Sequence, residues 1–292
     1  MSLAQRNTII TGGSQGLGRA IVETFAREGA SVLCCARDAA ALAALDDELR
    51  DIFNQPGQQF LLQPCDVSSE SEVAALFARA DAAFAATGGL HALVNNAGVY
   101  GPKGPTDEVD LAAWRQAIDI NLLGTLLPCR EATRRFKKTG YGKIVNLSGG
   151  GATNPLPNLS AYAASKAAVV RLTETLAEEL RAFRIDVNAV APGALNTRLL
   201  DEVLEAGPEK VGAKFYEQSL KQSREGGVPL ALGAELCAYL ASAASDGVTG
   251  KLISAKWDPW RTLHERREVL NKSDIYALRR IVPEDRGQKW EA

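Results

Sequence analysis

A phenol and an ammonium group lie four positions apart in the chain, at Tyr162 and Lys166. In a helix this spacing places both side chains on one face, one turn apart. An ammonium beside a phenol favours the phenolate, so the pair predicts a group that exchanges a proton with a substrate oxygen. The same spacing recurs by chance on helix surfaces, and alone it indicates only a solvent-facing pair.

Ser148 supplies a hydroxyl that could serve the same reaction. It directly follows the apolar run Lys143–Leu147, which predicts a buried strand. Ligands of open α/β folds bind at the carboxyl ends of the strands, where Ser148 is expected. There its hydroxyl could hold the oxygen of a carbonyl or alcohol while Tyr162 exchanges the proton.

The segment from Thr11 to Arg19 is rich in glycine and has the spacing G-x-x-x-G-x-G. It follows a predicted strand and opens a predicted helix, so its N–H groups would face the pyrophosphate of a dinucleotide. The spacing differs from the common G-x-G-x-x-G fingerprint, and a plain strand-to-helix turn is the alternative.

The end of the second predicted strand bears on the choice of nucleotide. Proteins that bind NAD often place a carboxylate there, on the ribose 2′-hydroxyl, whereas this chain has Ala36 followed by Arg37. An arginine can pair with a 2′-phosphate, so NADP is favoured over NAD. Alternatively, Arg37 is a solvated surface residue at a strand end.

Two further loops carry polar groups at the same predicted edge. Asp66 could accept a hydrogen bond from an adenine amino group, or it could cap the helix that starts near Ser68. The segment Asn95–Gly98 could meet a ribose or tie strands together, and alone its amides would be turn residues.

Strands and helices must alternate to position these groups. Short runs rich in Val, Ile and Leu predict seven strands, and longer amphipathic stretches lie between them, which is typical of a Rossmann-type doubly wound α/β fold with a parallel sheet. The predicted strands are 8–11, 31–36, 59–64, 92–95, 143–147, 186–190 and 251–254. The predicted helices are 17–28, 39–53, 70–86, 111–136, 159–183 and a split segment within 196–240.

Composition excludes several classes of protein. The 292 residues include 33 basic and 35 acidic side chains, and no apolar run reaches 18 residues, so neither nucleic acid nor membrane is an expected partner. No secretory leader pattern is present, and a cytoplasmic location is expected. The five scattered cysteines lack metal-binding spacing; we expect reduced, mostly buried thiols and no metal site.

Together these motifs resemble the short-chain dehydrogenase/reductase family, in its compact single-domain branch, over roughly residues 6–253. The order and spacing of the glycine loop, Asn95–Gly98, Ser148, Tyr162-x-x-x-Lys166 and Pro192-Gly193 carry the resemblance. It implies that the active-site residues are Asn121, Ser148, Tyr162 and Lys166. The expected cofactor contacts are Gly12, Ser14, Gln15, Gly16, Leu17, Gly18, Arg37, Asp66, Val67, Asn95, Ala97, Gly98, Tyr162, Lys166, Pro192, Gly193 and Thr197.

The resemblance also implies roles for these residues. Lys166 would lower the pKa of Tyr162 and grip the nicotinamide ribose, and Asn121 would support a water that leads to bulk solvent, or serve as a helix-bend residue. Thr197 would reach the cofactor's carboxamide, or cap a helix. The expected activity is interconversion of a ketone or aldehyde and an alcohol by hydride transfer, with a small-molecule substrate.

Three segments depart from the family pattern. Gly149–Ala152 is unusually permissive, and either makes room for a bulky substrate or forms a flexible turn. The segment 194–229 is expected to be a helical lid. Residues 1–256 are then the catalytic domain, and 257–292 are a C-terminal helical extension.

In that extension, helices are predicted from Asp258-Pro259 and from Ser273-Asp274, and three tryptophans argue for burial. We expect packing at or near a subunit interface of a homodimer or homotetramer. A clamp on its own subunit and closure over the substrate cleft are the alternatives.

Two other functions remain open from the residues. One is a sugar-nucleotide epimerase or dehydratase of a related fold, which the loop spacing and modest lid disfavour. The other is a non-catalytic dinucleotide-binding regulator, which the intact tyrosine, lysine, serine and asparagine disfavour.

Overall fold

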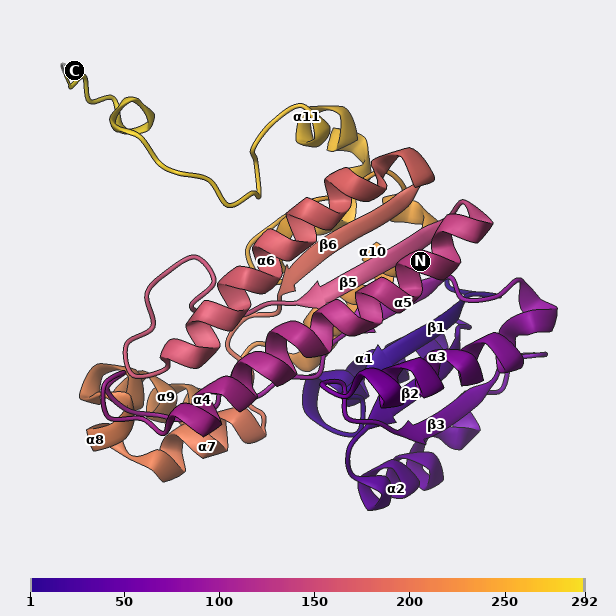
Figure 1. Cartoon of the computed structure of the whole chain (residues 1–292), viewed down its shortest axis with the longest axis horizontal. Coiled ribbons are helices and arrows are strands. Elements are labelled where there is room, and N and C mark those ends of the chain that lie inside the picture. Colours follow the sequence, from indigo (N-terminus) through magenta and orange to yellow (C-terminus); the bar gives the residue numbers. More distant parts are fainter. Residues whose placement is uncertain (1, 291–292) are drawn as a thin grey trace.

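A computed structural model describes residues 2–290 of the chain, and its centre is one parallel sheet of seven strands (Figure 1). The spatial order is β3-β2-β1-β4-β5-β6-β7, and every neighbouring pair is parallel. The doubly wound fold expected from the sequence is confirmed, with each strand within about two residues of its predicted bounds. The strands are β1 (Asn7–Thr11), β2 (Ser31–Ala36), β3 (Phe60–Pro64), β4 (Ala92–Asn95), β5 (Gly142–Leu147), β6 (Ile185–Ala191) and β7 (Leu252–Ser254).

Helices cover both faces of the sheet. One buried cluster joins the sheet to α1, α2 and α10, and another joins it to α3, α5 and α6. These helices and the remaining ones are α1 (Gly16–Arg27), α2 (Ala39–Leu49), α3 (Glu70–Phe84), α4 (Leu111–Ile118), α5 (Gly124–Thr139), α6 (Ser160–Leu180), α7 (Arg198–Ala206), α8 (Pro208–Val211), α9 (Ala213–Glu225), α10 (Leu230–Ala241) and α11 (Arg267–Asn271).

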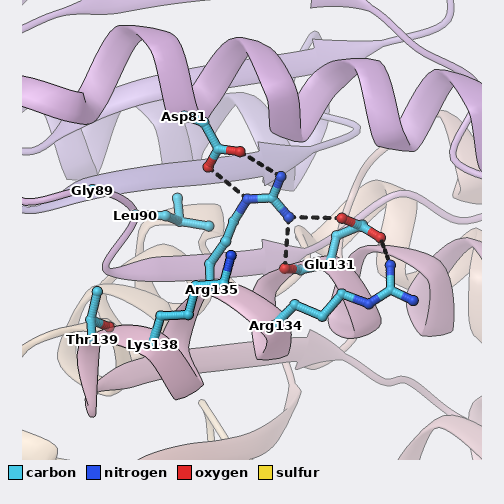
Figure 2. Close-up of a pocket in the computed structure, with 8 residues that line it drawn as sticks. All are labelled: Asp81, Gly89, Leu90, Glu131, Arg134, Arg135, Lys138 and Thr139. Carbon is cyan, nitrogen blue, oxygen red and sulfur yellow. Dashed lines mark hydrogen bonds and ion pairs between the residues drawn. The ribbon is translucent and has the colours of Figure 1, made fainter.

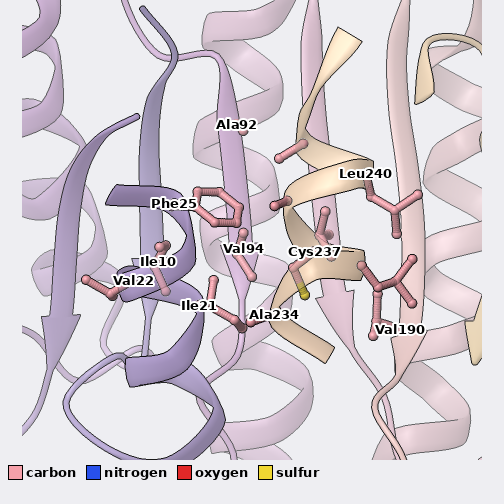
Figure 3. Packing of buried hydrophobic residues seen from close by; sticks show 14 of the residues in the cluster. Ile10, Ile21, Val22, Phe25, Ala92, Val94, Val190, Ala234, Cys237 and Leu240 are labelled. Carbon is pink, nitrogen blue, oxygen red and sulfur yellow. The ribbon is translucent and has the colours of Figure 1, made fainter. Parts of the chain in front are cut away.

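The strands are apolar on both faces because helices cover both sides of the sheet. Figure 3 shows Phe25 of α1 and Cys237 of α10 packed over the sheet, beside Ile10, Val94 and Val190 of three strands. All five side chains are buried. Because parallel strands in this layer meet helices above and below, both their faces must be apolar, which removes the alternating pattern of a half-exposed strand.

The winding of the chain reverses between β1 and β4. From β1 the chain moves to β2 and β3 on one side, then returns to place β4 on the other side of β1. The loops after β1 and β4 therefore diverge and leave a crevice at the carboxyl edge. The glycine loop and Asn95–Gly98 flank that crevice.

The single helix predicted for residues 111–136 is interrupted in the structure. A π-helical turn at Asp119–Leu123 separates α4 from α5. The turn places Asn121 in the interior, where its carbonyl accepts a hydrogen bond of 2.8 Å from the Thr125 hydroxyl. Insertion of one residue into a helix changes which face points inward, and sequence periodicity does not reveal it.

The C-terminal tail differs from its predicted form. A 3-10 helix, Trp260–Arg266, leads into α11, and Asp258 does not cap it but accepts a hydrogen bond from the Ser254 N–H. The helix predicted from Ser273 is absent. Instead Tyr276 has a left-handed backbone, with φ at +61°, and its carbonyl accepts the Leu252 N–H at 2.8 Å. Pairing with the edge strand β7 thus replaces the helix.

Of the three tail tryptophans, only Trp260 is buried. Its indole is 2% exposed and donates to the Ala255 carbonyl, whereas Trp257 and Trp290 are 76% and 74% exposed. Within this single chain, burial is therefore seen for one of the three, and packing of the other two against a neighbouring subunit stays a prediction. In Figure 1 the chain beyond α11 runs away from the sheet towards the C-terminus.

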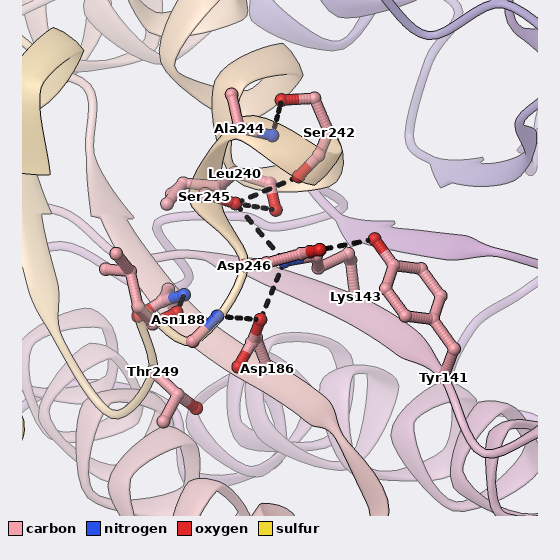
Figure 4. A network of polar contacts seen from close by, with 12 residues as sticks. Tyr141, Lys143, Asp186, Asn188, Leu240, Ser242, Ala244, Ser245, Asp246 and Thr249 are labelled. Atoms are coloured by element: carbon pink, nitrogen blue, oxygen red, sulfur yellow. Dashed lines mark hydrogen bonds and ion pairs between the residues drawn. The ribbon is translucent and has the colours of Figure 1, made fainter. Parts of the chain in front are cut away.

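A buried cation ties β5 to the far end of the sheet (Figure 4). The ammonium of Lys143, which is fully buried, lies 2.6 Å from Asp186 on β6 and 2.7 Å from Asp246. Asp186 also accepts the Gly247 N–H at 2.9 Å, and Asp246 accepts the Tyr141 hydroxyl at 3.1 Å. Such a charge is tolerated only because its partners are fixed around it.

We predict that Lys143→Ala lowers the free energy of unfolding by about 3 to 5 kcal/mol, because it leaves the buried Asp186 carboxylate without a cation. Lys272→Ala is the matched control, since Lys272 pairs with Glu268 on the exposed face of α11 and should change stability by about 0.5 kcal/mol or less. Urea unfolding of both variants measures the difference. If both variants lost the same free energy of unfolding, the Lys143 network would stabilise the protein no more than a surface ion pair.

Candidate active site

A cavity of about 1160 Å³ opens at the carboxyl edge of the sheet, over the reversal between β1 and β4. Nearly all the predicted site residues line it. They are Gly12, Ser14, Gln15, Gly16, Leu17, Gly18, Arg37, Asp66, Val67, Ala97, Gly98, Ser148, Tyr162, Lys166, Pro192, Gly193 and Thr197. Asn95 and Asn121 are not among its lining residues.

A second cavity, of about 400 Å³, lies between α3 and α5 (Figure 2). Arg135 crosses it and pairs with Asp81 and Glu131 at 2.6 and 2.7 Å. None of the predicted site residues lies there. Its two carboxylates are already paired with arginines, so the cavity over the sheet edge is the candidate site.

The glycine loop brings the start of α1 against the end of β1. A side chain at Gly18 would place its Cβ 2.1 Å from the Gly12 carbonyl oxygen, so only glycine fits. Gly12 itself has φ at +64°, in the left-handed region. The Asn96 side-chain amide donates to the carbonyls of Thr11 and Gly12, at 3.1 and 2.8 Å, and fixes the loop to β4.

The first turn of α1 has free N–H groups for an anion. Gln15, at the N-cap, makes no side-chain capping bond, and no acidic residue occupies the first turn. The partial positive charge at this end therefore faces the cavity without a protein counter-charge. These residues fit the pyrophosphate of a dinucleotide.

Arg37 and Asp66 lie at the end of the cavity formed by β2 and β3. Arg37 is exposed and lines the cavity, and its charge acts on Asp66. Burial opposes ionisation of Asp66, but hydrogen bonds from the Ser68 hydroxyl and N–H, together with Arg37, lower its pKa. Ser69, not Asp66, caps α3. The Asp66 carboxylate is thus oriented by Ser68 and ionised at the cavity wall.

The nearest other carboxylate at the end of β2 has a structural role. Asp38 accepts the N–H groups of Ala40 and Ala41, at 2.9 and 3.1 Å, as the N-cap of α2. Its position is two residues beyond Ala36. The side chain that follows β2 directly, and faces the cavity as a cation, is Arg37.

Asn95 points away from the cavity. Its buried amide donates to the Asn146 side-chain oxygen on β5, at 2.9 Å, and to Cys129. Of the two alternatives for this segment, the structure shows strand-tying for Asn95, because its side chain faces the next strand and not the edge. Asn96, the other amide of this segment, lines the cavity instead.

Tyr162 and Lys166 lie one turn apart on α6, and both are buried. The Lys166 ammonium donates to the Leu147 carbonyl at 2.9 Å and lies 5.8 Å from the centroid of the Tyr162 ring. Burial raises the pKa of Tyr162 above its ordinary value and lowers the pKa of Lys166 to about 8. The shift of the Tyr162 pKa comes from burial and from the nearby Tyr100, and the lowering expected from Lys166 is not seen in the protein alone.

The Tyr162 hydroxyl lies against the backbone of Gly149. A Cβ at that position would sit 2.3 Å from the hydroxyl oxygen, which explains why glycine follows Ser148. The ring of Tyr100 meets Tyr162 edge-on, with centroids 4.6 Å apart. The Ser148 hydroxyl contacts the Lys166 carbonyl at 3.5 Å, so all three polar side chains converge on one wall.

Asn121 holds the loop after β4 from behind. Its amide accepts the Val99 N–H at 2.8 Å and donates to the Val99 carbonyl and to Ser165, both at 2.9 Å. A Cβ at Gly98 would lie 3.2 Å from this amide oxygen and 3.3 Å from the Lys166 ammonium. Asn121 therefore acts at the cavity through Val99 and Gly98, from the π-helical turn.

Helices α7, α8 and α9 form the expected lid. Leu199, Leu200, Val203 and Phe215 line the cavity from this side. Lys103, in the loop after β4, pairs with Glu202 of α7 at 3.2 Å and fastens the lid across the opening.

Several lining residues were not predicted from the sequence, and Tyr100 is one of them. It lies in the loop after β4, so its position close to the predicted segment Asn95–Gly98 could have suggested it. Trp257, for which closure over the substrate cleft was one alternative, also lines the cavity. Gly149 was expected either to make room for a substrate or to form a flexible turn, and in the structure a Cβ there would lie 2.3 Å from the Tyr162 hydroxyl oxygen. Among residues 2–290 no cluster of His, Cys, Asp and Glu could hold a metal ion. Within the same range, no helix is both long and apolar enough to cross a bilayer.

Comparison with known proteins agrees with this geometry. The short chain dehydrogenase family pattern matches residues 6–207. The chain is 36% identical to cis-4-hydroxycyclohexanecarboxylate dehydrogenase of Sinomonas cyclohexanicum over 87% of its own length and 96% of that protein. It is 37% identical to 3beta-hydroxysteroid dehydrogenase 1 of Eggerthella lenta, over 86% of its length and 92% of that protein.

A solved structure is also similar to this chain. The 7 alpha-hydroxysteroid dehydrogenase in complex with NADH and 7-oxo glycochenodeoxycholic acid superposes with a TM-score of 0.74 at 31% identity, covering 87% of this chain and 93% of that one. The chain thus belongs to the short-chain dehydrogenase/reductase family and is an NAD(P)-dependent oxidoreductase that acts on CH-OH groups.

Proposed function

We propose that the protein is an NADP(H)-dependent carbonyl reductase or alcohol dehydrogenase in which Tyr162 exchanges the proton. The observation that carries this proposal is the convergence of Ser148, Tyr162 and Lys166 on the cavity that the glycine loop also lines. Relatives named for a cyclohexane alcohol and for hydroxysteroids support a ring-bearing secondary alcohol or its ketone as substrate.

The chain's own residues handle the oxygen of the substrate. The bound nicotinamide would supply or accept the hydride. In reduction, the Tyr162 hydroxyl donates its proton to the carbonyl oxygen and becomes a phenolate, while Ser148 donates a hydrogen bond to the same oxygen. In oxidation the phenolate takes the proton back. Burial raises the pKa of Tyr162, so the proton-holding form that reduction needs is present at neutral pH.

Lys166 and Asn121 support that exchange in different ways. The Lys166 ammonium, one turn from the phenol, stabilises the phenolate that forms when the proton leaves, and it is placed to hold the nicotinamide ribose. Asn121 is a positioning residue, because it fixes Val99 and Gly98 beside the ammonium.

The preference for NADP rests on Arg37. Ala36 presents no carboxylate to a 2′-phosphate, and the exposed Arg37 guanidinium faces the cavity. Asp66, held by Ser68, would accept the adenine amino group, and Thr197, which starts α7 without a capping bond, would reach the carboxamide. The remaining contacts would come from the loop residues Gly12 to Gly18, from Val67, Ala97 and Gly98, and from Pro192 and Gly193.

The surroundings of the enzyme are also proposals. We infer a cytoplasmic homodimer or homotetramer, with residues 1–256 as the catalytic domain. Residues 257–292 extend the same fold, because Trp260 and Leu270 join its core. The exposed Ile281 and Trp290 support a contact with a neighbouring subunit.

The other two functions are not favoured. The match to the compact dehydrogenases covers most of the chain and of its relatives, which argues against a sugar-nucleotide epimerase or dehydratase. Tyr162, Lys166 and Ser148 reach one cavity, which argues against a regulator that has lost its chemistry.

We predict that Tyr162→Phe reduces turnover by at least about 1000-fold, because it removes the proton donor, while NADPH affinity changes less than about threefold. Ketone reduction is followed by NADPH absorbance, and binding by fluorescence titration. Tyr141→Phe, a change at the opposite edge of the sheet, is the control and should keep its activity. Substantial activity in the Tyr162 variant would refute the proposed role.

Arg37→Ala should raise the KM for NADPH about tenfold or more and leave that for NADH nearly unchanged, because only the 2′-phosphate pairs with the guanidinium. Arg27→Ala, at the exposed end of α1, should alter neither. Steady-state kinetics with both nucleotides test this. A wild-type enzyme that prefers NADH would overturn the assignment of NADP.

Burial of Lys166 predicts a pH-dependent stability. Its pKa is lowered to about 8, whereas a lysine in the unfolded chain keeps its proton to about pH 10.4. Between these values the unfolded chain binds more protons than the folded one, so this group makes stability rise with pH. From about pH 8 to about pH 10, wild type should gain about 2 kcal/mol relative to Lys166→Met in urea unfolding without nucleotide. If the free energies of unfolding of wild type and Lys166→Met changed with pH in the same way, the burial of the ammonium would be contradicted.

A further inference from the structure

Two tryptophans three positions apart have opposite surroundings. Trp260 is 2% exposed, whereas Trp257 is 76% exposed and lines the large cavity beyond the end of β7. A large aromatic side chain that is left open on a cavity wall gains its contact area only when a ligand covers it. Trp257 therefore needs an explanation that core packing does not give.

The turn that carries Trp257 is held on both sides. The Ser254 N–H donates to the Asp258 carboxylate at 2.7 Å, and the Asp258 N–H donates back to the Ser254 carbonyl at 3.3 Å. The Trp257 N–H donates to the Ser254 hydroxyl at 3.3 Å, and the buried Trp260 anchors the next residues. Because the backbone around Trp257 is already ordered, little conformational entropy of this segment is lost when a ligand contacts the indole.

Apolar side chains predominate on the lid side of the cavity. They are Leu199, Leu200, Val203, Phe215 and Leu156, and the polar Ser219 and Gln222 line the same side. Of the charged groups in this half, Arg198 lies 3.5 Å from Glu202, and Asp258 is already used by the turn. Arg198 and Asp258 are therefore occupied within the protein, and the Lys256 ammonium lies against the Trp257 indole itself.

Space is available close to the reacting group as well. A Cβ built at Gly150, two residues after Ser148, would meet no atom within 4 Å. The cavity is thus open beside Tyr162, and it continues to the exposed indole at its mouth. Lys256 lies 4.3 Å from the centroid of that indole and covers part of it.

We propose that Trp257 is a substrate-binding residue that selects ketones and alcohols with an uncharged, apolar body of two or more fused rings. The reacting oxygen lies at Tyr162, and the ring body extends between the apolar lid wall and the Trp257 indole. This proposal rests on the proposed function, since it assumes that Tyr162 marks the reacting end.

The test compares three variants on two ketones, cyclohexanone and the fused-ring ketone 2-decalone. In Trp257→Ala, kcat/KM for the fused-ring ketone should fall about tenfold to a hundredfold, mainly through KM, because the burial of one large aromatic surface is lost. Cyclohexanone should change less than about threefold. Trp257→Phe should keep most of the activity, and Trp290→Ala, with an equally exposed tryptophan outside the cavity, should match wild type.

Several results would overturn the proposal. They are an unchanged kcat/KM for the fused-ring ketone in Trp257→Ala, an equal loss with both ketones, and a larger loss with an added ketohexose than with the fused-ring ketone. Since Trp257 is exposed, its replacement should leave the melting temperature within about 2 °C of wild type.

A binding measurement separates this proposal from the proposed function. The fused-ring ketone is titrated into Tyr162→Phe protein, with and without Trp257→Ala, and the heat of binding is followed by isothermal titration calorimetry. Saturable binding that Trp257→Ala weakens about tenfold or more supports the binding role even if wild type reduces no ketone, in which case only the proposed function fails. Reduction of the fused-ring ketone by wild type, together with an affinity that is unchanged without Trp257, refutes the binding role alone.

Discussion

The close approach of three backbone segments at the reversal of the sheet governs the rest of this structure. The end of β1, the first turn of α1 and the loop after β4 meet there, and Gly18 lies so near Gly12 that no side chain fits between them. The Asn96 amide bonds across the gap to Thr11 and Gly12. This junction fixes the N-terminus of α1 over the crevice, and the nucleotide side of the cavity follows from it.

Burial sets the electrostatics of the reacting groups. Tyr162 and Lys166 are enclosed by Gly149, Tyr100 and the strand edge, which raises the pKa of the phenol and lowers that of the ammonium. Both shifts favour the neutral forms, so in the protein alone the phenol keeps its proton. In the proposed function such a site would give a proton to a substrate oxygen, and the nearby ammonium would stabilise the phenolate that results.

The lid and the tail bring parts of the chain that are distant in sequence to one opening. Lys103 and Glu202 join the loop after β4 to α7, and the tail pairs with β7 through Leu252 and Tyr276. The tail also places Trp260 in the core and Trp257 at the cavity wall. The opening of the cavity is therefore shaped by surface segments that the sheet carries.

The sequence by itself determined the parallel sheet, the nucleotide loop and the reacting pair. The continuous apolar runs could be satisfied only between two helix layers, and the Tyr162–Lys166 spacing is a local property of one helix. Such features depend on neighbours within a few residues, which is why their bounds were predicted closely.

Tertiary structure decided what depends on distant partners. The Asn95 side chain bonds to Asn146 on the next strand, whereas the Asn96 side chain bonds to Gly12 at the cavity. A π-helical turn interrupts the predicted helix at Asn121. The helix predicted from Ser273 does not form, because the Tyr276 carbonyl accepts a hydrogen bond from the Leu252 N–H of the edge strand. The exposure of Trp257 and the burial of Trp260 likewise follow from which surfaces meet in space, and neither spacing nor composition encodes that.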